Sequence, residues 1–131
     1  MKHAVLTVIV FLSTVLAALI LNPHHASAGA RFTGAYLLHI CQVTSDGKAA
    51  ISGGHTACQA YIAGIIDYHN LQTMVGLAPD MPLCIPEDLP LNVLHEDVLA
   101  YLEKNKHHDD FVASPAVITA LYQKYPCKKK K

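Results

Sequence analysis

The sequence predicts an all-α fold, a small disulfide-stabilised helical domain of about four helices. Apolar side chains recur at helical spacing in four separate segments. Glycines, prolines and polar cap residues stand between these segments. The third observation is an even set of cysteines, which in a short chain with an export signal predicts two disulfides: Cys41, Cys58, Cys84 and Cys127.

Residues 1–28 are predicted to be a cleavable signal peptide. Lys2 supplies the positive charge, an uncharged and mostly apolar run covers residues 4–21, and Asn22-Pro23 interrupts it. Ala26-Ser27-Ala28 then provides the small-x-small pattern that a signal peptidase requires. The alternative is a membrane anchor, because the apolar run is nearly long enough to span a bilayer. Cleavage would leave residues 29–131 as one domain in the periplasm.

The first helix is expected over residues 33–41, with Leu37, Ile40 and Cys41 on one face. A polar, glycine-rich stretch follows, and its Ser45-Asp46-Gly47 sequence indicates a turn. A small hairpin that pivots on Asp46-Gly47 is an alternative to an open loop, although Lys48-Ala49-Ala50 are poor strand formers.

Thr56 is the expected N-cap of the second helix, which has the clearest apolar stripe in the chain. The stripe ends in a histidine and follows the spacing i, i+3, i+4, i+7, i+8 and i+11: Cys58, Tyr61, Ile62, Ile65, Ile66 and His69. Ile62 and Ile65 lie in its middle, so we expect both to be buried. Residues 74–86 should form a proline-rich loop around Cys84.

Pro90 suits the first turn of the third helix, which should end near Asn105. Its apolar face is Leu91, Leu94, Val98, Tyr101 and Leu102, and its other face carries His95, Glu96, Asp97, Glu103 and Lys104. Residues 106–110 read as a polar connector. Ser114-Pro115 reads as an N-cap followed by proline at the first position of the fourth helix, with the stripe Val117, Ile118, Leu121, Tyr122 and Tyr125.

Short connections favour antiparallel packing of successive helices, and this makes a prediction about the cysteines. Cys41 ends the first helix and Cys58 starts the second, so these two should lie at one end of the domain. Cys84 precedes the third helix and Cys127 follows the fourth, so these two should lie at the other end. Of the three pairings, Cys41–Cys58 with Cys84–Cys127 fits best.

The sequence carries no recognisable catalytic motif. The nucleophile elbow, the zinc-protease helix and the phosphate-binding glycine loops are all absent from it. Spacing between the cysteines is unlike that of a zinc site. His107-His108-Asp109-Asp110 could hold a transition metal, but adjacent residues rarely converge on one ion, and a polar loop explains them better. We therefore predict no cofactor, no metal and no enzymatic activity.

Charge gives little reason to expect a nucleic-acid partner. From residue 29 to Cys127 the acidic residues outnumber the basic ones, and only the last four residues form a basic run. A terminal lysine run on an acidic body is more typical of a solvated end than of a nucleic-acid surface. Once the leader is cleaved, no membrane anchor remains.

A set of spaced residues across about residues 32–127 resembles the small periplasmic immunity proteins that neutralise type VI secretion amidase effectors. The matching features, in order, are Leu37, Cys41, Cys58, Tyr61-Ile62, Gly64, Asp67, Cys84-Ile85-Pro86, Tyr101-Leu102, Pro115-Ala116, Ala120-Leu121 and Tyr125-Pro126-Cys127. The resemblance implies a helical domain with internal disulfides, often a homodimer. It also implies a protein that inhibits a peptidoglycan amidase by covering its active-site cleft.

Two other functions stay open at this point. A periplasmic chaperone or acid-stress protein would use the histidines, which gain charge between about pH 5 and pH 8. The third possible function is that of an enzyme. The matching residues are mainly scaffold, so the resemblance transfers no contact residue.

The expected contact segment is the polar loop over residues 44–55, because binding function usually resides in loops on a rigid scaffold. A Cys41–Cys58 bridge would anchor its base and reduce the entropy lost on binding. Asp109 and Asp110 are expected near its rim, at the same end of the bundle. The alternative is a connector without a partner. The candidate contact residues are Asp46, Ser52, Gly53, Gly54, His55, Asp109 and Asp110.

Overall fold

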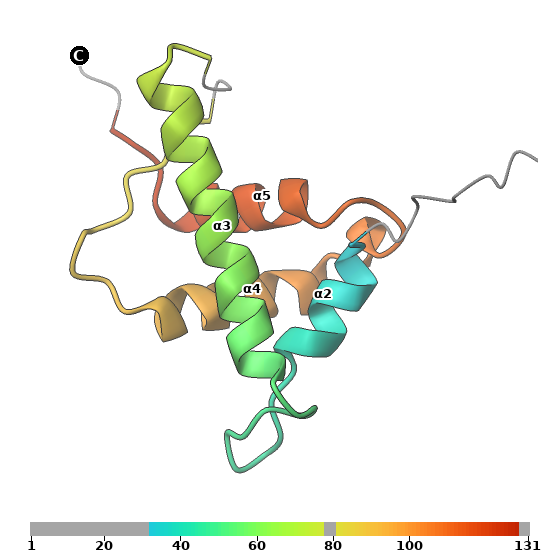
Figure 1. Cartoon of the computed structure of the whole chain (residues 1–131). Coiled ribbons are helices and arrows are strands. Elements are labelled where there is room, and N and C mark those ends of the chain that lie inside the picture. Colours follow the sequence, from blue (N-terminus) through green and yellow to red (C-terminus); the bar gives the residue numbers. More distant parts are fainter. Residues whose placement is uncertain (1–31, 78–80, 129–131) are drawn as a thin grey trace, which may run out of the picture. The chain divides into compact units, whose positions relative to one another are not determined.

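A computed structural model describes residues 32–77 and 81–128, and within these ranges the chain is helical (Figure 1). The elements are α2 (Gly34–Cys41), α3 (Gly54–Met74), α4 (Leu91–Lys104), the short 3-10 helix η1 (Lys106–His108) and α5 (Ser114–Lys124). The all-α prediction of four helices is confirmed. The predicted signal peptide lies outside the described residues, and none of the described helices is long and apolar enough to cross a membrane.

α3 crosses α4 and α5, which lie side by side, and α2 packs against the first half of α3 (Figure 1). The side chains between these helices form one core. Its largest fully buried members are Leu37, Ile62, Leu102, Leu121, Val98 and Val117, together with Cys41 and Cys58. All except Cys58 and Ile62 come from α2, α4 and α5, so α3 contributes to the core mainly through its first half.

The first helix begins as expected, because the Thr33 side chain accepts a hydrogen bond from the Tyr36 amide at 3.2 Å. The expected start of α3 at Thr56 is wrong: the helix begins at Gly54, with Gly53 as its N-cap. Gly53 has a φ of 75°, which favours glycine. A Cβ atom on Gly54 would lie 2.6 Å from the carbonyl oxygen of Ile40, so glycine permits this close approach of α3 to α2.

Two further cap predictions are wrong by one residue. The N-cap of α5 is Ala113, not Ser114, because the Val117 amide already donates to the Ala113 carbonyl at 3.2 Å. Pro115 still stands in the first turn, where its missing N–H costs nothing. Pro90 is the N-cap of α4 rather than part of its first turn.

Ile62 is fully buried as predicted, but the expected burial of Ile65 is only half correct. Ile65 packs against the core with one side and lines a surface cavity with the other. The reason is the length of α3, whose second half, from Ile65 to Met74, extends to the edge of the core. Tyr68, Leu71 and Met74 on this part are exposed.

Both predicted disulfides, Cys41–Cys58 and Cys84–Cys127, are present. The first joins the C-terminus of α2 to the first turns of α3. The second joins the segment before α4 to the segment after α5. Backbone hydrogen bonds flank the second bridge, from the Cys84 amide to the Tyr125 carbonyl at 2.9 Å and from the Cys127 amide to the Pro82 carbonyl at 3.2 Å.

Tyr125, next to this second disulfide, donates a hydrogen bond from its hydroxyl to Asp97 of α4 at 2.5 Å. The same carboxylate pairs with Lys124 at 3.2 Å. Burial, together with the Asp97 carboxylate, raises the pKa of Tyr125 to about 12. The hydrogen bond thus ties the end of α5 to the middle of α4.

We expect Tyr125→Phe to lower the free energy of unfolding by about 1.5 kcal/mol near neutral pH, as a lost hydrogen bond to a charged group does. The raised pKa favours the folded state while the tyrosine is protonated. This contribution is complete below the unfolded pKa of about 10 and is lost as the pH rises towards 12. Urea unfolding of both proteins should therefore show a difference that shrinks between these pH values, whereas a constant difference would contradict this origin.

Candidate functional site

The segment between α2 and α3 is a folded loop rather than a floppy connector. Val43 and Ala49 form an isolated antiparallel bridge, and the Thr44 amide donates to the Lys48 carbonyl at 2.8 Å. Gly47, with a φ of 77°, makes the turn, so the hairpin alternative describes this segment best. Its residues are exposed from Gln42 to Lys48. The loop therefore presents a fixed shape to solvent.

Asp46 lies at the tip of this loop and is held by its neighbours. Its carboxylate pairs with the Lys48 ammonium at 2.6 Å and accepts a hydrogen bond from the Thr44 hydroxyl. These two bonds lower the pKa of Asp46 below its usual value, so it is ionised at neutral pH. As both charged side chains are solvent-exposed, the pair contributes little to stability. It leaves one negative and one positive group available to a partner.

The last four residues of the expected contact segment play different parts. Ser52 and Gly53 are exposed, whereas Gly54 is buried against the Ile40 carbonyl and cannot offer a contact surface. His55 is half-buried, and its ring packs edge-on against His95 with centroids 4.9 Å apart. Gly54 is therefore a structural position, and only the neighbouring residues can meet a partner.

Asp109 and Asp110 do not lie beside this loop, so their expected position at the same end of the bundle is wrong. The Ala35 amide donates to the Asp109 carbonyl at 3.2 Å, and the Gly34 amide donates to the Phe111 carbonyl at 3.0 Å. These bonds place the segment at the N-terminus of α2, whereas the loop leaves its C-terminus. The eight residues of α2 separate the two by about 12 Å.

A cavity of about 290 Å³ lies between the loop and α4. The loop side contributes Val43, Gly47, His55 and Gln59, and the α4 side contributes Asn92, His95, Glu96 and Leu99. The sequence analysis missed this α4 face, although its residues follow the spacing i, i+3, i+4 and i+7 of one helical face. The exposed lining of the cavity is mainly apolar, although several of its side chains also carry polar groups, so it suits a partner side chain with an apolar stem.

His95 is the main correction among the residues of α4, because it is buried rather than on the solvent face. It is 4% exposed. Its Nε2–H donates to the Cys41 carbonyl at 2.7 Å, which accounts for a polar side chain in this position. Through this bond His95 fixes α4 to the C-terminus of α2, directly under the loop.

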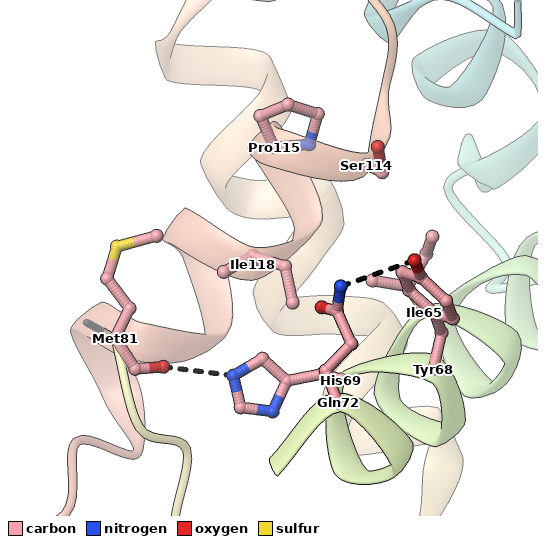
Figure 2. A pocket seen from close by; sticks show the side chains of 8 residues that line it. All are labelled: Ile65, Tyr68, His69, Gln72, Met81, Ser114, Pro115 and Ile118. Atoms are coloured by element: carbon pink, nitrogen blue, oxygen red, sulfur yellow. Dashed lines mark hydrogen bonds between the residues drawn. The ribbon is translucent and has the colours of Figure 1, made fainter. Parts of the chain in front are cut away.

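A second cavity of about 250 Å³ lies between the far half of α3 and the start of α5 (Figure 2). It is mainly apolar and is lined by Ile65, Tyr68, His69, Gln72, Met81, Ser114, Pro115 and Ile118. His69 is buried and donates from Nε2 to the Met81 carbonyl at 3.1 Å. Exposed Leu71, Met74, Val75 and Leu77 continue this apolar surface along α3 and beyond its end.

The four-residue motif from His107 to Asp110 is a folded connector. The His108 ring is hydrogen-bonded to the Tyr101 hydroxyl at 3.0 Å and lies against His107. Burial and the neighbouring His107 lower the pKa of His108. Over residues 32–77 and 81–128, the set of side chains close enough to share a metal is a different one: Cys41, Cys58 and His95.

These features define the class of protein: a small helical scaffold, cross-linked at both ends, that displays a rigid loop. In the described part of the chain, every cysteine is in a disulfide and no serine or threonine hydroxyl is hydrogen-bonded to a histidine ring.

The chain belongs to the Rap1a immunity proteins, whose family model matches residues 33–127. The match covers all four helices and both disulfides. No curated protein and no solved structure is significantly similar to the chain. Membership of this family makes the protein an immunity protein with a secreted effector as its partner.

Proposed function

We propose that this protein is a periplasmic inhibitor of a peptidoglycan amidase effector of type VI secretion, and that it covers the active-site cleft of that enzyme. The observation that carries the proposal is the match to the Rap1a immunity proteins over residues 33–127. Both disulfides support an extracytoplasmic site of action, since such bonds persist in oxidising compartments. The amidase class rests on the family resemblance of the spaced residues.

The loop over residues 42–53, together with the α4 face beside it, is the contact surface in this proposal. It combines the exposed charges of Asp46 and Lys48 with the mainly apolar cavity between the loop and α4. The Cys41–Cys58 bridge holds the base of the loop, so little conformational entropy is lost when a partner binds. A rigid protrusion beside a hollow is suited to entering an enzyme cleft.

The direct test titrates the purified protein against the cognate amidase and follows peptidoglycan hydrolysis. We expect inhibition that is complete near stoichiometric amounts, with a stable complex by size-exclusion chromatography. Light scattering of the same samples reports whether the inhibitor acts as a homodimer. Full hydrolysis in the presence of excess protein would refute the proposed target.

Ser52→Trp tests the proposed contact surface. Ser52 is an exposed residue of this loop, so a bulky ring should block the approach of a partner without disturbing the core. We expect the affinity for the amidase to fall at least tenfold, about 1.4 kcal/mol or more. The matched control is Gln123→Trp at an exposed position of α5, and this variant should bind normally. Equal affinity of the two variants would move the contact surface away from the loop.

Export is tested separately. The Ala26-Ser27-Ala28 pattern predicts cleavage after Ala28, with Gly29 as the first residue of the mature protein. Mass spectrometry of the periplasmic fraction should find this N-terminus. An intact leader in the membrane fraction would contradict both cleavage and a freely diffusing inhibitor.

A further inference from the structure

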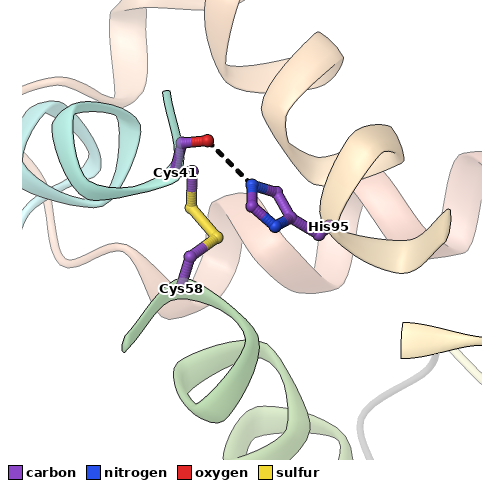
Figure 3. Close-up of side chains that lie close together, drawn as sticks. All are labelled: Cys41, Cys58 and His95. Atoms are coloured by element: carbon purple, nitrogen blue, oxygen red, sulfur yellow. Dashed lines mark hydrogen bonds between the residues drawn. A yellow bond between two sulfur atoms is a disulfide. The ribbon is translucent and has the colours of Figure 1, made fainter. Parts of the chain in front are cut away.

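The buried disulfide under the loop has a histidine as its neighbour (Figure 3). The sulfur atoms of Cys41 and Cys58 and an imidazole nitrogen of His95 all lie within 4.8 Å of one another, and all three residues are buried. Thiolates and imidazoles are the ligands that zinc prefers in structural sites. Cys41 and Cys58 form a covalent bridge in the oxidised chain, and after reduction their thiolates would lie beside the imidazole of His95.

The hydrogen bond of His95 prepares the ring for coordination. Because a carbonyl oxygen only accepts, the Nε2 atom must carry the proton that it donates to Cys41 at 2.7 Å. The neutral ring then keeps its lone pair on Nδ1. Histidines that bind metals usually donate their other N–H to a carboxylate or a backbone carbonyl in this way.

His55 is the candidate for a fourth ligand, although it is not among the side chains whose ligand atoms all lie within 4.8 Å of one another. It precedes Cys58 by less than one turn of α3, and its ring lies 4.9 Å from that of His95. Its Nε2 atom is buried and has no hydrogen-bond partner among the described residues. A buried nitrogen without a partner is costly, and coordination would satisfy it.

An ion between the two sulfurs needs more room than the disulfide occupies. Two thiolates on one tetrahedral zinc lie about 3.8 Å apart, given Zn–S bonds of about 2.3 Å, so the sulfurs must separate when the bridge opens. His55 and His95 line the cavity of about 290 Å³ between the loop and α4, whereas neither cysteine lines it.

We propose that the reduced chain binds one zinc ion through the thiolates of Cys41 and Cys58 and the imidazole of His95, with His55 as the fourth ligand. A dithiol reductant supplies two electrons and two protons, which turn the S–S bond into two thiols while the reductant becomes a disulfide. Zinc then replaces the two thiol protons, which pass to solvent, and the imidazoles bind in their neutral form. The ion ties α2 to α3 in the reduced chain as the disulfide does in the oxidised chain.

Cobalt(II) is the probe for this site, because a tetrahedral cobalt–thiolate centre absorbs strongly in the visible. Under a phosphine reductant and without oxygen, we expect one cobalt per chain, displaced by an equal amount of zinc. The oxidised protein should bind none. His95→Ala should weaken cobalt binding at least tenfold, and His55→Ala should weaken it as well. His69→Ala is the matched control, since His69 is buried to the same 4% on α3 but lies outside the cluster.

Alkylation of the thiols in the reduced protein gives an independent readout. It uses the unchanged sequence, so no substitution can affect the result by unfolding the chain. Zinc should protect Cys41 and Cys58 and leave Cys84 and Cys127 reactive, as read by peptide mass spectrometry. Equal protection of all four cysteines, or equal cobalt affinity of the His95→Ala and His69→Ala variants, would show binding by an unfolded chain and overturn the proposal. If the His55→Ala variant binds cobalt with undiminished affinity, His55 is not the fourth ligand.

Discussion

Removing the Cys84–Cys127 bridge by a double change to alanine is expected to lower the free energy of unfolding by about 4 kcal/mol. The bridge closes a loop of 43 residues that contains α4, η1 and α5. Without it the unfolded chain gains the conformational freedom that this closure removes. Since a domain of this size has a net stability of only about 5–15 kcal/mol, the loss is a large part of the total.

Urea unfolding followed by circular dichroism measures this change. The control is the corresponding double change to alanine at Cys41 and Cys58. The bridge between these two closes a shorter loop of 17 residues, so its removal should cost about 3 kcal/mol by the same reasoning. The two proteins should therefore rank in the order of their loop lengths. A loss below about 1 kcal/mol for the longer loop would mean that residual structure already restrains the unfolded chain.

The positions of the helices and the pairing of the cysteines could be predicted because both depend on local information. The stripe through Cys58, Tyr61 and Ile62 marks one face of a helix from its spacing alone. Short connections then constrain neighbouring helix ends to lie together, and this constraint selects the disulfide pairing. Each step uses contacts between residues that are close in sequence or ends that must meet.

The burial of His95 could not be predicted in the same way. Its hydrogen-bond partner, the Cys41 carbonyl, is 54 residues away and is a backbone atom, which leaves no trace in the amino-acid pattern. The position of Asp109 also depends on its backbone, which binds the first turn of α2. Gly54 looked like part of a flexible loop, but its role is set by the Ile40 carbonyl against which it packs.

These corrections change the picture of the candidate site. The acidic pair near η1 leaves it, and the α4 face with Asn92 and Glu96 enters it. Asp46 and Ser52 remain exposed on the loop side. The surface proposed to meet the amidase therefore extends from the loop onto α4 and does not reach the N-terminus of α2.

Ile62→Ala is expected to lower the free energy of unfolding by about 2–5 kcal/mol, the usual cost of a large-to-small change in a close-packed core. Ile62 is fully buried and belongs to the core cluster that α3 shares with the other helices. Truncation removes apolar contacts and leaves a cavity that the rigid helices around it cannot fill. Denaturant unfolding, with the slope checked for two-state behaviour, gives the value.

The matched control is Ile65→Ala, the same change one helical turn further along α3. Ile65 is half-buried and already borders a cavity of about 250 Å³, so its truncation enlarges a solvent-accessible hollow and should cost only about 1 kcal/mol. The ratio of the two losses thus measures where the core ends along α3. Equal losses would mean that the core continues under Tyr68 and His69. A loss below about 0.5 kcal/mol for Ile62 would mean that this face of α3 is not core at all.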